Sequence, residues 1–266
     1  MNLSLFIAKR YFFSGKTKVT VNIISLISLI GVSIGTAALV LLLSVFNGFE
    51  NLLLSMYNTF DPHLKITSNE GKTFNSDSVN ILLNEHDDLL YFTDVLEEKV
   101  LMKNGEYEFI ASIKGVGDDF SKMISLDSII TEGENMELYE SKSVAILGQG
   151  VAYHLSMGVG NMFNRLNIFV PNRGSTTLLN PSNAFSSASV LPIGIFSLGA
   201  QYDNEYIITP ITFLQDLVGK KEVSAIEIKL KEKYKMLEIQ EDLKERLGEK
   251  YLVQNQLQQH AILYKI

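Results

Sequence analysis

The feature that most constrains this chain is an uncharged stretch near its front, ISLIGVSIGTAALVLLLSVFNGFE. No charged residue lies between Lys18 and Glu50, and residues 21–46 are almost wholly apolar or small. A signal-peptide core is only about 7 to 15 residues long, and no convincing small-x-small cleavage site follows this stretch. At about 1.5 Å per residue it would reach roughly 39 Å, against a hydrocarbon core of about 30 Å. The sequence therefore predicts a retained transmembrane helix that tilts or projects from the bilayer.

A second apolar pattern indicates projection rather than tilt. Apolar residues continue beyond the stretch at steps of 3, 4, 3 and 4, the spacing of one helix face, at Phe46, Phe49, Leu53, Met56 and Phe60. We expect the helix to continue as a stalk over residues 47–60. It should end at Asp61-Pro62, because proline disfavours a helical residue before it. Packing of these apolar groups on the following domain is an equally good explanation and is compatible with a stalk.

Charge predicts the orientation of the helix. All 30 acidic residues follow Lys18, whereas four of the 23 basic residues, Lys9, Arg10, Lys16 and Lys18, precede the apolar stretch. Basic residues stay on the cytoplasmic side, so the N-terminus should be cytoplasmic and the main domain extracytoplasmic. Residues 1–20 mix large apolar groups with these cations, as a segment lying at the inner membrane interface does. The acidic remainder excludes a nucleic-acid footprint.

Gly31 and Gly35 form a G-x-x-x-G pattern inside the apolar stretch, with small residues around them. Small residues at this spacing let a second transmembrane helix approach closely. We therefore predict that this face packs against another helix, although glycine is also common in such helices in general.

Motifs for catalysis or cofactor binding are weak. SGKT at residues 14–17 lacks the first glycine and the preceding strand of a phosphate-binding loop. GQG at residues 148–150 lacks the third glycine of a dinucleotide site. The histidines, at positions 63, 86, 154 and 260, are isolated, and the chain has no cysteine. We expect neither an enzyme nor a resident metal or cofactor.

The rest of the chain predicts an α+β domain over residues 61–259. Alternating runs typical of strands occur at 64–67, 91–101, 107–114, 143–147, 166–170, 190–196, 206–209, 223–230 and 251–254. Plausible helices lie at 76–85, 150–155, 211–218 and 235–247. The segment between Phe120 and Ser143 has no long period and is expected to be loosely built.

One stretch, PNRGSTTLLNPSNAFSSAS at residues 171–189, does not fit a compact domain. A polar, proline-bearing loop of this length between two strands is usually either functional or disordered. Its large apolar residues Leu178, Leu179 and Phe185 have no obvious core to enter. We expect a protruding arm that uses these three residues to bind a partner.

Four motifs together resemble one family. FIAKRYFFSGK, NIISLISLIGVSIGTAALVLLLSVFNGFE, ILGQGVAYHLSMGVGN and PIGIFSLGAQYDNEYIIT are similar to the LolC/LolE transmembrane subunits of the lipoprotein-releasing ABC transporter, within the MacB-type permease superfamily. The resemblance spans nearly the whole chain. It implies a periplasmic domain of the MacB core type with a protruding hairpin arm, in the inner membrane of the cell.

The resemblance also implies partners and a mechanism. Family members have four transmembrane helices, with the periplasmic domain between the first and second, so residues 260–266 would lead toward a second span. ATP would be bound by a separate ATP-binding cassette subunit, and a second permease subunit would complete a homodimer or heterodimer. The arm would correspond to the hook that captures the periplasmic lipoprotein carrier, which receives the lipoprotein cargo. Because the chain has one apolar stretch only, the sequence suggests a fragment or a truncated product.

Two alternatives stay open at this stage. A MacB-like or FtsX-like permease could serve efflux or the control of cell-wall hydrolases. A single-span anchored binding module is what the sequence, taken literally, encodes. The cargo and the choice between a LolC-like and a LolE-like role are not encoded in any motif that we identify.

Overall fold

A computed structural model describes residues 3, 6–7, 10, 19–139, 143–161, 163–171 and 185–259, with the backbone alone at 19–22, 50–59 and 138. The chain forms two compact units, residues 1–55 and 56–266. Leu178, Leu179 and the expected lead-in at residues 260–266 lie outside the described residues.

The first feature of the fold is a long helix, α2 (Val19–Phe60), of 42 residues. Within it, Ile23–Phe49 has a mean hydropathy of 2.5 and none of its residues is buried, so this segment is long and apolar enough to cross a membrane. The helix ends at Phe60, and Pro62 explains why, since proline disfavours helical backbone at Asp61. The prediction of one continuous helix ending before Asp61-Pro62 is therefore confirmed.

The second unit contains two halves that share strand β2. The first half has the order β-α-β-β-α-β and consists of β1 (Leu64–Ser68), α3 (Asp77–Asn84), β2 (Leu89–Asn104), β9 (Ala225–Leu230), α8 (Met236–Leu247) and β10 (Tyr251–Asn255). Its strands lie in the order β10-β1-β9-β2 and every neighbouring pair is antiparallel. This is the ferredoxin-like arrangement.

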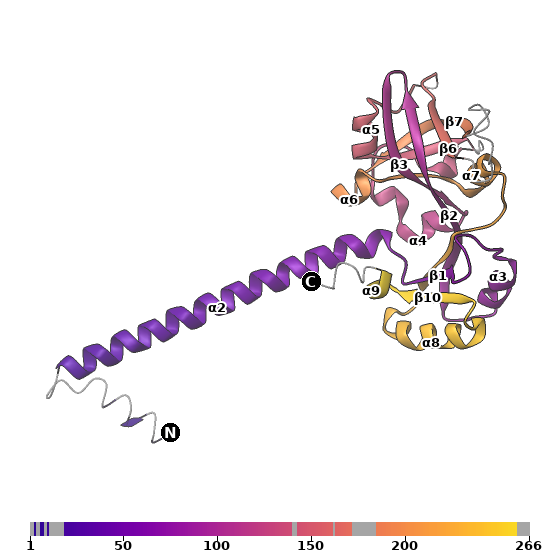
Figure 1. Cartoon of the computed structure of the whole chain (residues 1–266). Helices are drawn as coiled ribbons and strands as arrows, with labels where there is room; N and C mark the ends of the chain where they lie inside the picture. Colours follow the sequence, from indigo (N-terminus) through magenta and orange to yellow (C-terminus); the bar gives the residue numbers. More distant parts are fainter. Residues whose placement is uncertain are drawn as a thin grey trace. The chain divides into compact units, whose positions relative to one another are not determined.

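The two faces of the ferredoxin-like sheet differ in chemistry. Buried residues on one face, such as Ile66 and Ile228, pack against Val79 of α3 and Leu243 of α8, and Figure 1 shows both helices beside these strands. Since neighbouring residues of a strand point to opposite faces, Lys65 and Glu227, which pair across β1 and β9, lie on the other face.

The chain between β2 and β9 forms the second half, a closed barrel. It contributes β3 (Tyr107–Val116), β5 (Val144–Gly148), β6 (Leu166–Pro171), β7 (Phe185–Phe196) and β8 (Tyr206–Pro210). Strand pairing runs β2-β3-β8-β5-β7-β6 and returns to β2, because β6 pairs with both β7 and β2. A short strand, β4 (Ile130–Gly133), adds to the end of β7. The barrel is thus an insertion between the second and third strands of the ferredoxin-like half.

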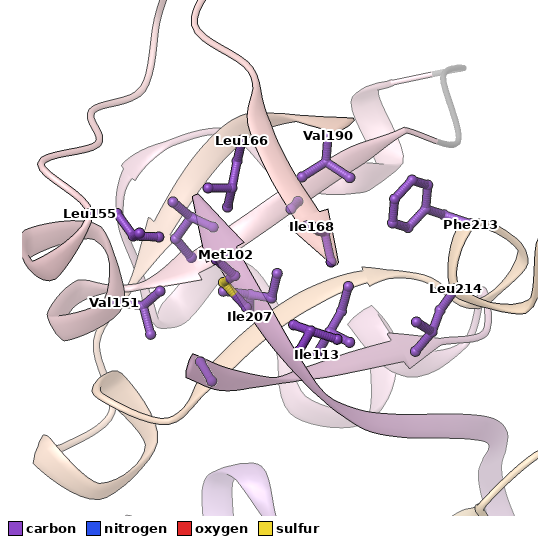
Figure 2. Packing of buried hydrophobic residues seen from close by; sticks show 14 of the residues in the cluster. Met102, Ile113, Val151, Leu155, Leu166, Ile168, Val190, Ile207, Phe213 and Leu214 are labelled. Atoms are coloured by element: carbon purple, nitrogen blue, oxygen red, sulfur yellow. The ribbon is translucent and has the colours of Figure 1, made fainter. Parts of the chain in front are cut away.

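The barrel is filled by side chains. Met102, Ile113 and Ile207 are fully buried in its core cluster. Figure 2 shows Val151, from α5 (Gln149–His154), on one side of this cluster and Leu214, from α7 (Ile211–Val218), on the other. The interior of the barrel is therefore a packed hydrophobic core.

The segment after Phe120 corrects one expectation. It is not loosely built, because α4 (Phe120–Ile124), a 3₁₀ turn and β4 fold it onto the outside of the barrel. Phe120 and Leu126 are fully buried in a second core cluster that also contains Val116 and Ile208 of the barrel strands. The apolar residues of this segment belong to several short elements and therefore have no single period. The lack of a period wrongly suggested a loosely built segment.

The other expected elements are present with shifted boundaries. All nine predicted strands occur, as do the four predicted helices. Besides α4 and β4, the short helices α6 (Ala200–Asp203) and α9 (Gln256–Gln259) were not expected. Strand β7 begins at Phe185 and not at Val190, because Phe185–Ser189 pair with β6 despite their polar sequence. The α+β class is confirmed.

Candidate functional sites: the helix joint and the arm

The end of α2 is held by a group of aromatic rings. The ring of Phe60 lies 4.8 Å from that of Tyr202, 5.8 Å from Tyr206 and 6.3 Å from both Phe120 and Phe196. Phe60 is 3% exposed. Such ring pairs contribute about 0.5–1.5 kcal/mol each beyond the burial of area. The last residue of the helix is therefore part of the core of the second unit.

A buried cation lies against the same ring. The Lys114 Nζ is 4.4 Å from the centre of the Phe60 ring and 5.0 Å from that of Phe120. It donates hydrogen bonds to both carboxylate oxygens of Glu227, at 2.8 and 3.0 Å. The two side chains are 3% and 2% exposed. Both charges are thus paired within the protein and are almost completely shielded from water.

Further charges extend this pair along the sheet. Glu97 lies 4.0 Å from the Lys114 Nζ and 3.7 Å from the Lys65 Nζ. Burial alone would lower the pKa of Lys65, but the carboxylates of Glu97, Glu227 and Asp61 outweigh it and raise this pKa above its ordinary value. Lysines and glutamates alternate here, so each charge has an opposite neighbour. We call Phe60, Lys114, Glu227 and Glu97 the helix joint.

The linker after Phe60 is also fixed. The Tyr202 hydroxyl donates to the Asp61 carboxylate at 2.9 Å, and the Gln256 side chain donates to the Asp61 carbonyl at 3.3 Å. The His63 Nδ1 accepts the Leu230 backbone N–H at 3.1 Å. Burial, followed by the charges of Lys233 and Lys229, lowers the pKa of His63 to about 4. His63 is therefore neutral near pH 7 and can serve as an acceptor.

The arm starts from a regular hairpin. β6 and β7 pair from Leu166 with Val190 to Pro171 with Phe185. Phe185 is 49% exposed, and so it lies outside the core as expected. The other two predicted anchors, Leu178 and Leu179, lie outside the described residues. The structure thus describes the base of the arm and the exposure of one of the three residues predicted as anchors, while the binding role of all three stays a prediction.

Gly31 and Gly35 lie on one face of α2, since they are four residues apart. A Cβ atom built on either residue meets no other atom within 4 Å. The helix surface is therefore open at both positions.

The GQG motif has a packing role. A Cβ on Gly148 would lie 2.4 Å from the Asp203 carbonyl oxygen, and one on Gly150 would lie 2.0 Å from the Asn204 side chain. Asp203 in turn accepts hydrogen bonds from the Ser197 hydroxyl and the Leu198 N–H. The two glycines allow α6 to pack against the start of α5. This explains the motif without a dinucleotide.

The described histidines fit structural roles. His154 stacks on Phe109 with the ring centres 4.5 Å apart, and His86 lies 3.4 Å from Asp242. Within the part of the chain that the structure describes, no group of three or more histidine, aspartate or glutamate residues could hold a metal ion.

Fold and sites together define a class: a domain with an inserted barrel, carried on an apolar helix whose end is part of the core. The family model of the MacB-like periplasmic core domain matches residues 25–246. This chain belongs to that family.

Curated relatives are subunits of one transport system. Over 271 aligned residues the chain is 22% identical to the lipoprotein-releasing system transmembrane protein LolE of Haemophilus influenzae, covering 100% of this chain and 64% of that protein. It is 24% identical to LolC of Buchnera aphidicola, covering 74% and 46%, and 24% identical to LolC of Neisseria meningitidis, covering 86% and 54%. The chain thus spans about half to two thirds of the length of these relatives.

Solved structures agree on the fold. The extracellular domain of the ABC-type transporter YknZ from Gram-positive bacteria gives a TM-score of 0.51 at 12% identity, covering 72% of this chain and 99% of that one. The periplasmic region of MacB from Actinobacillus actinomycetemcomitans gives 0.50 at 12% identity, covering 76% and 92%. At this identity the likeness concerns the fold alone.

The helix joint makes a prediction about stability. Lys114→Met should destabilise the domain by about 3 kcal/mol, because it leaves the Glu227 carboxylate buried without its main partner. Lys114→Met combined with Glu227→Leu should lie within about 1 kcal/mol of wild type, since neither charge is then buried. Urea unfolding of the purified chain in detergent, followed by circular dichroism, measures both.

The matched control is Lys103→Met, which removes the 2.7 Å ion pair with Glu108 on the surface, where the side chains are 43% and 51% exposed. It should cost under about 1 kcal/mol. If the Lys114 single variant were no less stable than this control, Lys114 and Glu227 would not be a buried pair.

Proposed function

We propose that this chain is the first span and extracytoplasmic domain of a permease subunit in a lipoprotein-releasing ABC transporter. The observation that carries the proposal is the alignment with LolE of Haemophilus influenzae along the entire chain, apolar helix included. The arm adds support, because it lies in sequence between β6 and β7, where the resemblance expects a carrier-binding hook. The proposed task is to pass lipoproteins from the inner membrane to a periplasmic carrier.

The chain would contribute no catalysis of its own. The chemistry of ATP hydrolysis would belong to a separate ATP-binding cassette subunit on the cytoplasmic side, and a second permease subunit would pair with this one. The basic residues before the span, Lys9, Arg10, Lys16 and Lys18, support a cytoplasmic N-terminus and a periplasmic domain. Energy from ATP would then have to cross the membrane along α2.

The arm is the proposed carrier-binding element. Phe185 at its base is about half exposed, and Leu178 and Leu179 lie farther along the same loop in sequence. Apolar anchors in a polar segment suit a partner with an open hydrophobic groove, since binding energy concentrates in a few buried apolar side chains. The alternative function is efflux or the control of cell-wall hydrolases. The fold that this chain shares with MacB and YknZ does not favour lipoprotein release over this alternative.

Replacing Leu178, Leu179 and Phe185 together by serine should weaken carrier binding by well over tenfold, because each anchor contributes on the order of 2 kcal/mol. The thermal unfolding of the domain should not change, as none of the three is expected in the core. The measurement is a titration of the chain in lipid nanodiscs with the periplasmic lipoprotein carrier of the same organism, alongside a thermal melt.

The matched control is Leu237→Ser on α8, a leucine that is 64% exposed and far from the arm in sequence. It should bind the carrier like wild type. Equal affinity of wild type and the triple variant would exclude the arm as the binding element, and a lost melting transition would place its residues in the core.

The open face at Gly31 and Gly35 is the proposed contact with another transmembrane helix. Leucine at both positions should weaken photo-crosslinking from a crosslinker residue at Ser28 to a neighbouring subunit in the membrane, because the backbones can no longer approach closely. Ser33→Leu, which lies roughly on the opposite face of the helix, should leave the crosslink intact. An unchanged crosslink in the Gly31 and Gly35 double variant would remove this contact from the account.

A further inference from the structure

Several contacts around the end of α2 join the barrel half to the ferredoxin-like half. Lys114 of β3 belongs to the barrel, while its partner Glu227 lies on β9 of the ferredoxin-like half. The Lys229 Nζ of β9 donates a hydrogen bond to the Met123 carbonyl of α4, which packs on the barrel. Charge and hydrogen bonding thus connect the two halves at one place.

Phe60 occupies the centre of this place. Its ring is surrounded by side chains of the barrel half, from α4, β7, α6 and β8. Four residues later the chain enters β1 of the ferredoxin-like half. The bond from the Tyr202 hydroxyl to Asp61 fixes the linker between them. Phe60 is therefore packed in the barrel half, and the chain links it directly to the first strand of the ferredoxin-like half.

There is little free space around Phe60. The cavity beside it has a volume of only about 10 Å³ and is lined from both halves, by Phe60, Asp61, Met123, Ile124, Glu227 and Lys229 among others. A space of this size holds at most one water molecule. In a close-packed interior, a displacement of Phe60 displaces the side chains that contact it.

The geometry points to Phe60 as a wedge whose position sets the angle between the barrel and the ferredoxin-like half. The Lys114–Glu227 ion pair and the Lys229–Met123 hydrogen bond hold the two halves together around Phe60. Since Phe60 also ends α2, a shift or rotation of the last helical turn would change this angle and move the base of the arm, which is formed by the barrel strands β6 and β7. That use in transport rests on the proposed function, whereas the wedge itself rests on the contacts alone.

The test is a distance measurement between the two halves of the whole chain. The natural sequence has no cysteine, so Ile81→Cys on α3 and Tyr153→Cys on α5, both at exposed positions, can carry spin labels. Double electron–electron resonance then gives the distribution of distances between the halves. Phe60→Leu should make this distribution about twofold wider or shift its mean, because interfaces between packed bodies move when a filler is lost. Phe60→Ala should do so more strongly.

The matched control is Phe213→Leu. Phe213 is 6% exposed and is therefore buried, as Phe60 is. It lies on α7 in the core of the barrel. This variant should lower the melting temperature and leave the distance distribution unchanged. An unchanged distance distribution in the Phe60 variants, or equal broadening in Phe60→Leu and Phe213→Leu, would overturn the wedge and make Phe60 an ordinary core residue. Neither carrier nor ATP enters the measurement, so its failure is distinct from failure of the proposed function.

Discussion

The buried pair of Lys114 and Glu227 beneath the ring of Phe60 constrains how the two halves of the second unit meet, because neither charge can lose the other without being left uncompensated. A lysine and a glutamate this far from water are stable only while each satisfies the other. Glu97 and Lys65 continue the alternation of charge across the sheet. The helices α3 and α8 cover one face of the ferredoxin-like sheet. On the other face, charged side chains pair with one another beside apolar groups.

The helix joint indicates that the apolar helix does more than attach the domain to a membrane. A helix that only attached the domain to a membrane could end in a polar linker, and its last residue would need no partners. Here the last residue is 3% exposed among aromatic rings, and the following Asp61 is hydrogen-bonded at once. Under the proposed function, in which the ATPase lies on the other side of the membrane, such an end would link the span to both halves of the domain and, through β6 and β7, to the base of the arm.

Most of the fold could be predicted from the sequence, because the signals are local. The long helix follows from its apolar run and Pro62, and the strands follow from alternation. The barrel could not be predicted, since its closure depends on β6 pairing with two strands that are distant in sequence. The joint was missed for a similar reason. Lys114 follows the buried Ile113, and Glu227 lies between the buried Ile226 and Ile228. A charge beside buried apolar residues was a signal, but only the register of the sheet brings the two charges together. The arm was predicted as a loop from composition, while pairing extends β7 to Phe185.

The proposed function requires that the domain and the N-terminus lie on opposite sides of the membrane, and labelling of single cysteines tests this most directly. Thr17→Cys and Lys231→Cys are introduced separately into the cysteine-free chain, and intact spheroplasts are treated with a membrane-impermeant thiol reagent. We expect the reagent to label position 231 and to spare position 17 until the membrane is permeabilised. Labelling of position 17 with position 231 protected would place the domain in the cytoplasm and contradict the account.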